Sequence, residues 1–179
     1  VFTRSAKCGY GINAPEMNRN DFNGVDVKGH AAAICVSSPD GIHPHSKWLA
    51  YHDIGKRIND AISLGANAIL LYNDDKTADD PDTTLIKKIT PCSVPVVFLT
   101  GDQDPERQME VLENGGDDYI LKPVRPRHLI AAVQSRVRRA RALQSRIAST
   151  AHAARHPVTG PYPRPALTQK PAALPLTLT

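Results

Sequence analysis

The chain has 179 residues, 41% of them hydrophobic and 22% charged, with a formal net charge of +4. This length allows one domain with a real core and an appendage, and no apolar run is long enough to cross a membrane. Cys8, Cys35 and Cys92 form no CxxC pair, so we expect neither a disulfide framework nor a zinc ribbon. Their scatter, and the absence of a signal-peptide pattern, predict a cytoplasmic protein with reduced thiols.

The charge is divided sharply along the chain. Residues 1–118 hold 11 Lys/Arg and all 18 Asp/Glu, whereas residues 119–179 hold 11 Lys/Arg and no acidic residue. An acidic body joined to a basic end favours self-association or an acidic partner.

The first half begins with turns and then alternates strand and helix. Residues 1–29 are rich in Gly, Asn and Pro, so we predict an extended segment of short pieces and loops there. A buried strand is predicted over 31–36, and an amphipathic helix over 47–64. A second apolar strand, over 68–72, ends in a polar turn and an acidic loop.

The second half continues this alternation. We predict a short helix over 84–89, a strand over 94–99, and a helix that begins at Asp104 with a cap and a proline and ends at Gly115. A strand over 119–121 and a long helix over 127–149 follow.

The predicted fold is therefore a three-layer, mainly parallel α/β sheet of the receiver or flavodoxin type, with a long C-terminal helix. We place the α/β domain at 30–148, after the N-terminal segment 1–29. The Pro-rich residues 149–179 are expected to form a disordered tail.

Two phrases in the second half, PVVFLTG and GGDDYILKPV, resemble the carboxy-terminal half of a response-regulator receiver domain. The resemblance covers residues 94–146 and implies that Thr100 and Lys122 flank a phosphorylated Asp. A hydroxyl and an ammonium at neighbouring strand ends can both reach the oxygens of one acyl phosphate. Either residue alone would also fit an ordinary strand end or turn.

The receiver resemblance implies an acceptor aspartate just after the strand over 68–72. Asp74 holds that position and Asp75 is the runner-up; the alternative is that both belong to a solvated acidic loop. In receivers an acidic pair at the end of the first strand holds Mg²⁺. Here that strand ends in two serines, which leaves Asp40 and Asp74 as a weak metal site and predicts a degenerate receiver.

Two further resemblances point elsewhere. Residues 8–100, with GYGINAPEMNRNDFNGVDVKGHAAAICV and GANAILLYNDD, are similar to the protease-associated domain of zinc aminopeptidases, a non-catalytic insert. None of the zinc-binding segments of the peptidase is present. Residues 155–166 resemble a degraded opening of a GGDEF diguanylate cyclase domain, whose catalytic loop is missing. The chain therefore reads as a mosaic.

The helix predicted over 127–149 has one apolar stripe and several arginines that lie mostly off it. Steps of three and four residues connect the stripe, which consists of Leu129, Ile130, Val133, Val137, Ala140, Leu143 and Ile147. This pattern predicts that part of the helix packs on the sheet. The rest of the helix is either exposed to solvent or forms a coiled-coil seam with a second copy. Without an aromatic platform or a helix-turn-helix pattern, we do not expect nucleic-acid binding.

We therefore expect a non-catalytic signalling module resembling the receiver of a phosphorelay, with a histidine kinase or a second copy as partner, no membrane, and Mg²⁺ as its only possible cofactor. The alternatives are a protease-associated accessory domain, or an engineered or accidental chimera with no evolved activity.

Overall fold

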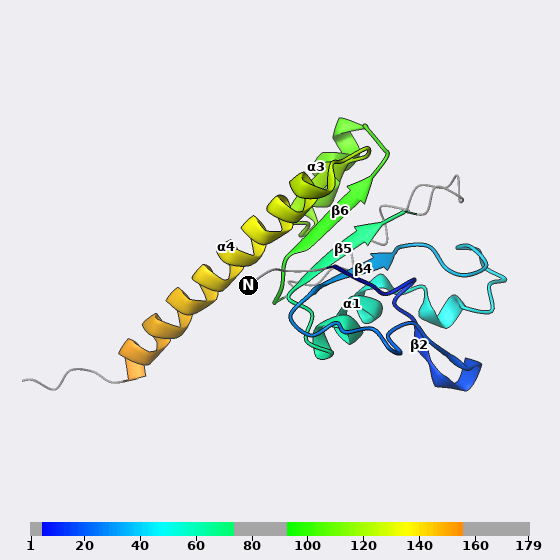
Figure 1. Cartoon of the computed structure of the whole chain (residues 1–179), viewed down its shortest axis with the longest axis horizontal. Helices are drawn as coiled ribbons and strands as arrows, with labels where there is room; N and C mark the ends of the chain where they lie inside the picture. The colour runs from blue at the N-terminus through cyan, green and yellow to red at the C-terminus, as the bar shows by residue number, and fades with distance from the viewer. Residues whose placement is uncertain (1–4, 74–92, 156–179) are drawn as a thin grey trace, which may run out of the picture.

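The computed structural model describes residues 5–73 and 93–155, and Figure 1 shows how their elements are arranged. Parallel strands form a five-stranded sheet in the order β1-β4-β5-β6-β7. The bounds of these strands are Ser5–Lys7, Ala31–Cys35, Ala68–Tyr72, Val96–Thr100 and Asp118–Leu121. A short antiparallel pair, β2 (Asn13–Ala14) and β3 (Arg19–Asn20), lies outside this sheet.

In the part of the chain that the structure describes, three α-helices and two 3-10 turns accompany the strands. The helices are α1 (Ile54–Ser63), α3 (Pro105–Glu113) and α4 (Pro126–Arg155), and the turns are η1 (Pro15–Met17) and η2 (Leu49–Tyr51). A proline and an acidic residue in its first turn suit the start of α3, because the missing N–H is not needed there and the acid complements the helix dipole.

The sheet separates two apolar layers. On one face, side chains of β4, β5 and β6 such as Ile34 and Phe98 pack with Ile58 of α1 and Val111 of α3. On the other face, strand residues including Leu70 and Val97 pack with Val133 and Val137 of α4. In Figure 1, α4 accordingly runs along the sheet on the side away from α1. The predicted three-layer, parallel α/β fold is confirmed.

The strands follow one another across the sheet in chain order. Right-handed crossovers in such a sheet place successive connecting helices on the same face, which agrees with α1 and α3 sharing one layer. Doubly wound sheets bind ligands where the strand order reverses, and the five strands of this sheet show no such reversal. The ends of β4 to β7 still meet at one carboxyl edge.

Several predicted boundaries are wrong. The helix expected over 47–64 begins at Ile54, because Asp53 caps it by accepting a hydrogen bond from the Gly55 N–H at 2.9 Å. The long helix continues past 149 to Arg155, because half of the residues from 150 to 155 are alanine, the best helix former. The strand expected from 94 starts at Val96.

The N-terminal segment holds a strand of the main sheet, which the predicted four-strand core had missed. Ser5, Ala6 and Lys7 of β1 pair in parallel with three alanines of β4. The helix predicted over 84–89 lies outside the described residues, as do Asp74, Asp75 and the tail from 156 onward. Among the helices that the structure describes, none is both long and apolar enough to cross a membrane.

Candidate functional site

Thr100 and Lys122, the two residues implied by the receiver resemblance, lie together at the carboxyl edge of the sheet. The backbone N–H of Lys122 donates to the carbonyl of Thr100 at 2.6 Å, and the Lys122–Pro123 peptide bond is cis. The Lys122 side chain reaches past the end of β6, and its Nζ donates to the carbonyl of Asn73 at 2.9 Å. Asn73 follows β5 and immediately precedes Asp74.

The loop from β6 to α3 fixes the Thr100 hydroxyl through a series of short-range hydrogen bonds. Thr100 is buried, and its Oγ1 accepts from the N–H of Asp102 at 3.0 Å. Asp102 in turn accepts from the N–H of Asp104, and Asp104 caps α3 by accepting from the N–H of Glu106. These are the local turns that Thr and Asp favour. The Thr100 O–H can therefore donate to an oxyanion at this edge.

Asp40, the predicted metal ligand of the first half, instead organises its own loop after β4. Its Oδ1 accepts from the hydroxyls of Ser46 at 2.7 Å and Ser38 at 3.1 Å, and its Oδ2 accepts from the N–H of Lys47 at 3.2 Å. The hydrogen bond from Ser46 is the main cause that holds the pKa of Asp40 below its usual value. Its predicted co-ligand, Asp74, lies outside the described residues.

Ser46 also lies 3.1 Å from Nε2 of His52, which gives an Asp–Ser–His series. The hydroxyl has one proton, and the closer carboxylate of Asp40 takes it as a hydrogen bond, so His52 donates to Ser46. A serine nucleophile requires the opposite arrangement, with histidine accepting the serine proton. The buried Ser46 is therefore a structural residue of this loop.

Arg57 of α1 is a residue of this edge that the sequence analysis did not single out. It is only 1% exposed, and its guanidinium lies within hydrogen-bond distance of five backbone carbonyls. These acceptors belong to Tyr10, Cys35, Val36, Ser37 and His52. The signal in the sequence was an arginine inside the apolar stripe of a helix, between Ile54 and Ile58.

The described residues at the end of β4 do not fit Mg²⁺, which receiver domains commonly bind. This ion prefers carboxylates and water in an octahedral arrangement. The strand end offers the buried hydroxyls of Ser37 and Ser38, and Asp40 already accepts three hydrogen bonds. The positive charge of Arg57 lies against the same strand end. Among the described residues, no group of three or more His, Cys, Asp or Glu could hold a metal.

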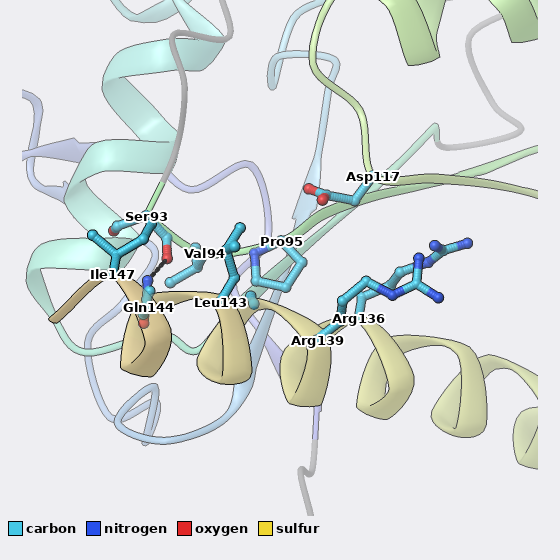
Figure 2. Close-up of a pocket in the computed structure, with 10 residues that line it drawn as sticks. Ser93, Val94, Pro95, Asp117, Arg136, Arg139, Leu143, Gln144 and Ile147 are labelled. Carbon is cyan, nitrogen blue, oxygen red and sulfur yellow. Dashed lines mark hydrogen bonds between the residues drawn. The ribbon is translucent and has the colours of Figure 1, made fainter. Parts of the chain in front are cut away.

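A groove of about 300 Å³ lies at the opposite, amino edge of the sheet, beside the second half of α4. Figure 2 shows Leu143 and Ile147 facing the segment 93–95, where Gln144 donates to the carbonyl of Ser93 at 2.7 Å. Leu143 is 58% exposed and Ile147 is 61% exposed, so α4 carries apolar side chains beyond its contact with the sheet.

Comparisons with known proteins agree with the receiver resemblance over part of the chain. No family model matches. The chain is 34% identical over 80 residues to the two-component response regulator ORR7 of Oryza sativa subsp. indica. The matched region covers 42% of this chain and 39% of that protein. It is 48% identical over 46 residues to the DNA-binding response regulator MtrA of Mycobacterium tuberculosis, 26% of this chain and 20% of that protein.

Similar solved structures include a two-component response regulator from Clostridium difficile, with 31% sequence identity and a TM-score of 0.38. The similarity covers 46% of this chain and 67% of that chain. The chain spans less than half the length of the two curated relatives named above. The resemblances to a protease-associated domain and to a GGDEF opening stay predictions. Over part of its length, this chain is similar to response-regulator receiver domains.

Proposed function

We propose that this chain is a non-catalytic, receiver-like signalling module in which Asp74, or else Asp75, accepts a phosphoryl group from a histidine kinase. A carboxylate oxygen of the acceptor forms the new P–O bond as the P–N bond of the kinase phosphohistidine breaks. Thr100 donates its O–H, and Lys122 its ammonium, to the phosphoryl oxygens. Receiver domains are generally signalling modules without a catalytic activity of their own, and this proposal assigns none to the chain.

The contact between the Lys122 ammonium and the Asn73 carbonyl supports this proposal most directly. The two residues are 49 positions apart, and the contact brings a cation to the chain position next to Asp74. A lysine in an ordinary exposed turn would extend into solvent, whereas the side chain of Lys122 extends across the end of the neighbouring strand β6. The half-buried Lys122 and the buried Thr100 lie at adjacent strand ends, where both can contact one tetrahedral anion.

Beryllofluoride, a mimic of the aspartyl phosphate, tests the acceptor assignment. We expect saturable changes in the amide NMR signals of Thr100 and Lys122, lost in Lys122→Ala and in Asp74→Asn. Loss in Asp75→Asn rather than Asp74→Asn would move the acceptor to Asp75. Lys7→Ala, an exposed lysine on the far strand β1, is the control that keeps the response. No response of the wild-type chain at millimolar ligand would refute the proposal.

We also propose that the second half of α4 joins two copies of the chain. All residues from Arg141 to Ala151 are exposed, and the apolar pair of Leu143 and Ile147 lies on the same helix face, four residues apart. The acidic body and the basic helix complement each other in charge, which favours a second copy as the partner.

The oligomeric state tests this second proposal. Light scattering after size exclusion should give a dimer for the wild-type chain and a monomer for the double variant Leu143→Glu/Ile147→Glu. Ser145→Glu adds one charge to the same exposed turn of α4 and should leave the dimer intact. A wild-type monomer at high micromolar concentration would contradict the role of α4 as an interface.

A further inference from the structure

Arg57 places a fixed positive charge at the carboxyl edge of the sheet. Its Nη1 lies 3.2 Å from the carbonyl of Cys35 and 2.9 Å from that of Ser37, and its Nη2 lies 3.1 Å from the carbonyl of Val36. Burial lowers the pKa of Arg57 to about 10, so the guanidinium stays protonated at neutral pH. The charge therefore faces the end of β4 permanently.

None of the hydrogen-bond acceptors of Arg57 in the described residues is a carboxylate. Buried charges in proteins are normally paired, because an uncompensated ion in a low dielectric is costly. Here carbonyl dipoles solvate the guanidinium, and its Nε has no hydrogen-bond partner within the described part of the chain. Within the described residues, no carboxylate is hydrogen-bonded to the guanidinium, and the negative charges of Asp53 and Asp21 act on it only through space.

The guanidinium and Lys122 lie on opposite sides of the end of β5. Val36, which accepts from Arg57, donates its own N–H to the carbonyl of Tyr72 at 2.9 Å. Tyr72 is the last residue of β5, and the next carbonyl, that of Asn73, accepts from the Lys122 ammonium. Two cationic side chains thus flank the strand end at which the proposed acceptor follows.

We propose that the carboxyl edge of the sheet binds a phosphoryl group without a divalent cation, because Arg57 holds a fixed positive charge on the side of β5 where receivers hold their metal. A divalent ion there would be repelled by Arg57 and would find hydroxyls in place of an acidic pair. A phosphoryl group or its mimic, in contrast, is attracted by the same charge. Binding of the oxyanion rests on the proposed function, whereas exclusion of the metal does not.

Direct metal binding is the first test. Mn²⁺ broadens the NMR signals of amides close to it, and we expect no saturable broadening at Val36 or Thr100 of the wild-type chain up to about 1 mM. Saturable broadening at these two amides, with a dissociation constant below that concentration, would overturn the inference. This measurement needs no variant, so it decides the matter even where changes at Arg57 prevent folding.

Charge variants sharpen this test. Arg57→Gln removes the charge and should raise the affinity for Mn²⁺ by on the order of tenfold, whereas Arg57→Lys keeps the charge and should bind as weakly as the wild type. The dispersion of the amide spectrum shows whether each variant is folded. Equal Mn²⁺ affinity in a folded Arg57→Gln and in Arg57→Lys would contradict a role for the guanidinium charge.

Beryllofluoride with and without Mg²⁺ separates the two proposals. Equal responses of Thr100 and Lys122 in Mg²⁺ and in a chelator would support both the receiver function and its independence of metal. A response only with Mg²⁺ would overturn the inference and leave the proposed function standing. No response in either solution would overturn the proposed function and the oxyanion part of the inference, while the Mn²⁺ result would still decide the exclusion of metal.

Discussion

Arg136 of α4 and Asp118 of β7 form an ion pair in which Nε and Nη2 of the arginine both lie 3.0 Å from Oδ2 of the aspartate. The two side chains are 29% and 24% exposed, so water screens the pair only in part. The pair connects the helix to the edge strand of the sheet, and Arg136 lies next to the buried Val137 and about one turn after the buried Val133.

The first prediction concerns this ion pair. Arg136→Ala should lower the free energy of unfolding by about 1 kcal/mol, because partly buried pairs exceed the small contribution of exposed ones. Urea unfolding measures this loss, and a double-mutant cycle with Asp118→Asn isolates the coupling. Arg138→Ala, an exposed arginine of the same helix, is the control and should change stability by less than about 0.5 kcal/mol. Zero coupling between positions 118 and 136 would show that the pair is only a surface contact.

The second prediction concerns the tight turn between α3 and β7. A Cβ at Gly116 would lie 2.8 Å from Cγ1 and 2.9 Å from the carbonyl oxygen of Val111, whose side chain is buried. The backbone oxygen cannot move aside cheaply, so Gly116→Ala should cost about 1–3 kcal/mol of stability. A Cβ at Gly101 would meet no atom within 4 Å, so Gly101→Ala should be near neutral. Equal unfolding midpoints for the two variants would contradict this description of the turn.

The apolar strands were predictable because strands buried on both faces read as continuous apolar runs. The runs of β4, β5 and β6 have this form. Strand β1 has only three residues, and Ala6 alone is buried, so its sequence carries no periodic signal. Its place in the sheet comes from the pairing with β4, which no local pattern reports.

The candidate site was predictable only where a receiver-like sequence motif contains its residues. Such motifs contain Thr100 and Lys122, but the contact between Lys122 and Asn73 depends on how three strand ends align. Arg57 was not predicted as a site residue because a charged residue is normally expected on the solvent side of a helix. Its position in the stripe of Ile54, Ile58 and Ala61 was the available signal, and the carbonyls that surround it explain why a cation is tolerated there.

The third prediction concerns stability at mildly acidic pH. Burial lowers the pKa of His52, and the nearby charge of Arg57 lowers it further. The unfolded chain therefore takes up a proton near pH 6.5 that the folded chain resists, so the free energy of unfolding should fall as the pH falls below this value. Urea unfolding between pH 7.5 and pH 5.5 should show this fall in the wild type and a smaller one in His52→Gln.

His45, an exposed histidine of the same loop, provides the control for the third prediction. His45→Gln should keep the pH dependence of the wild type, because it leaves His52 and the residues that bury it unchanged. If His52→Gln and the wild type lost stability in parallel on acidification, the burial of His52 would not be the cause.

The last prediction concerns Cys8, whose side chain is fully buried and donates its S–H to the carbonyl of Ala6 at 3.3 Å. Burial and the charge of Asp21 raise the pKa of the Cys8 thiol from 9.0 to about 11. The folded chain therefore holds this proton to higher pH than the unfolded chain does. The resulting stabilisation is fully present below about pH 9 and is lost as the pH rises toward 11.

Comparing the wild type with Cys8→Ala isolates this effect, because the alanine does not titrate and leaves a cavity whose cost does not depend on pH. The difference in unfolding free energy should be constant from pH 7 to about 8.5, and should then shrink by at most about 1.4 kcal/mol per pH unit. Urea midpoints at half-unit steps of pH measure it. A difference that stays constant up to pH 10.5 would mean that water reaches the thiol, because a solvated thiol would titrate alike in the folded and unfolded chains.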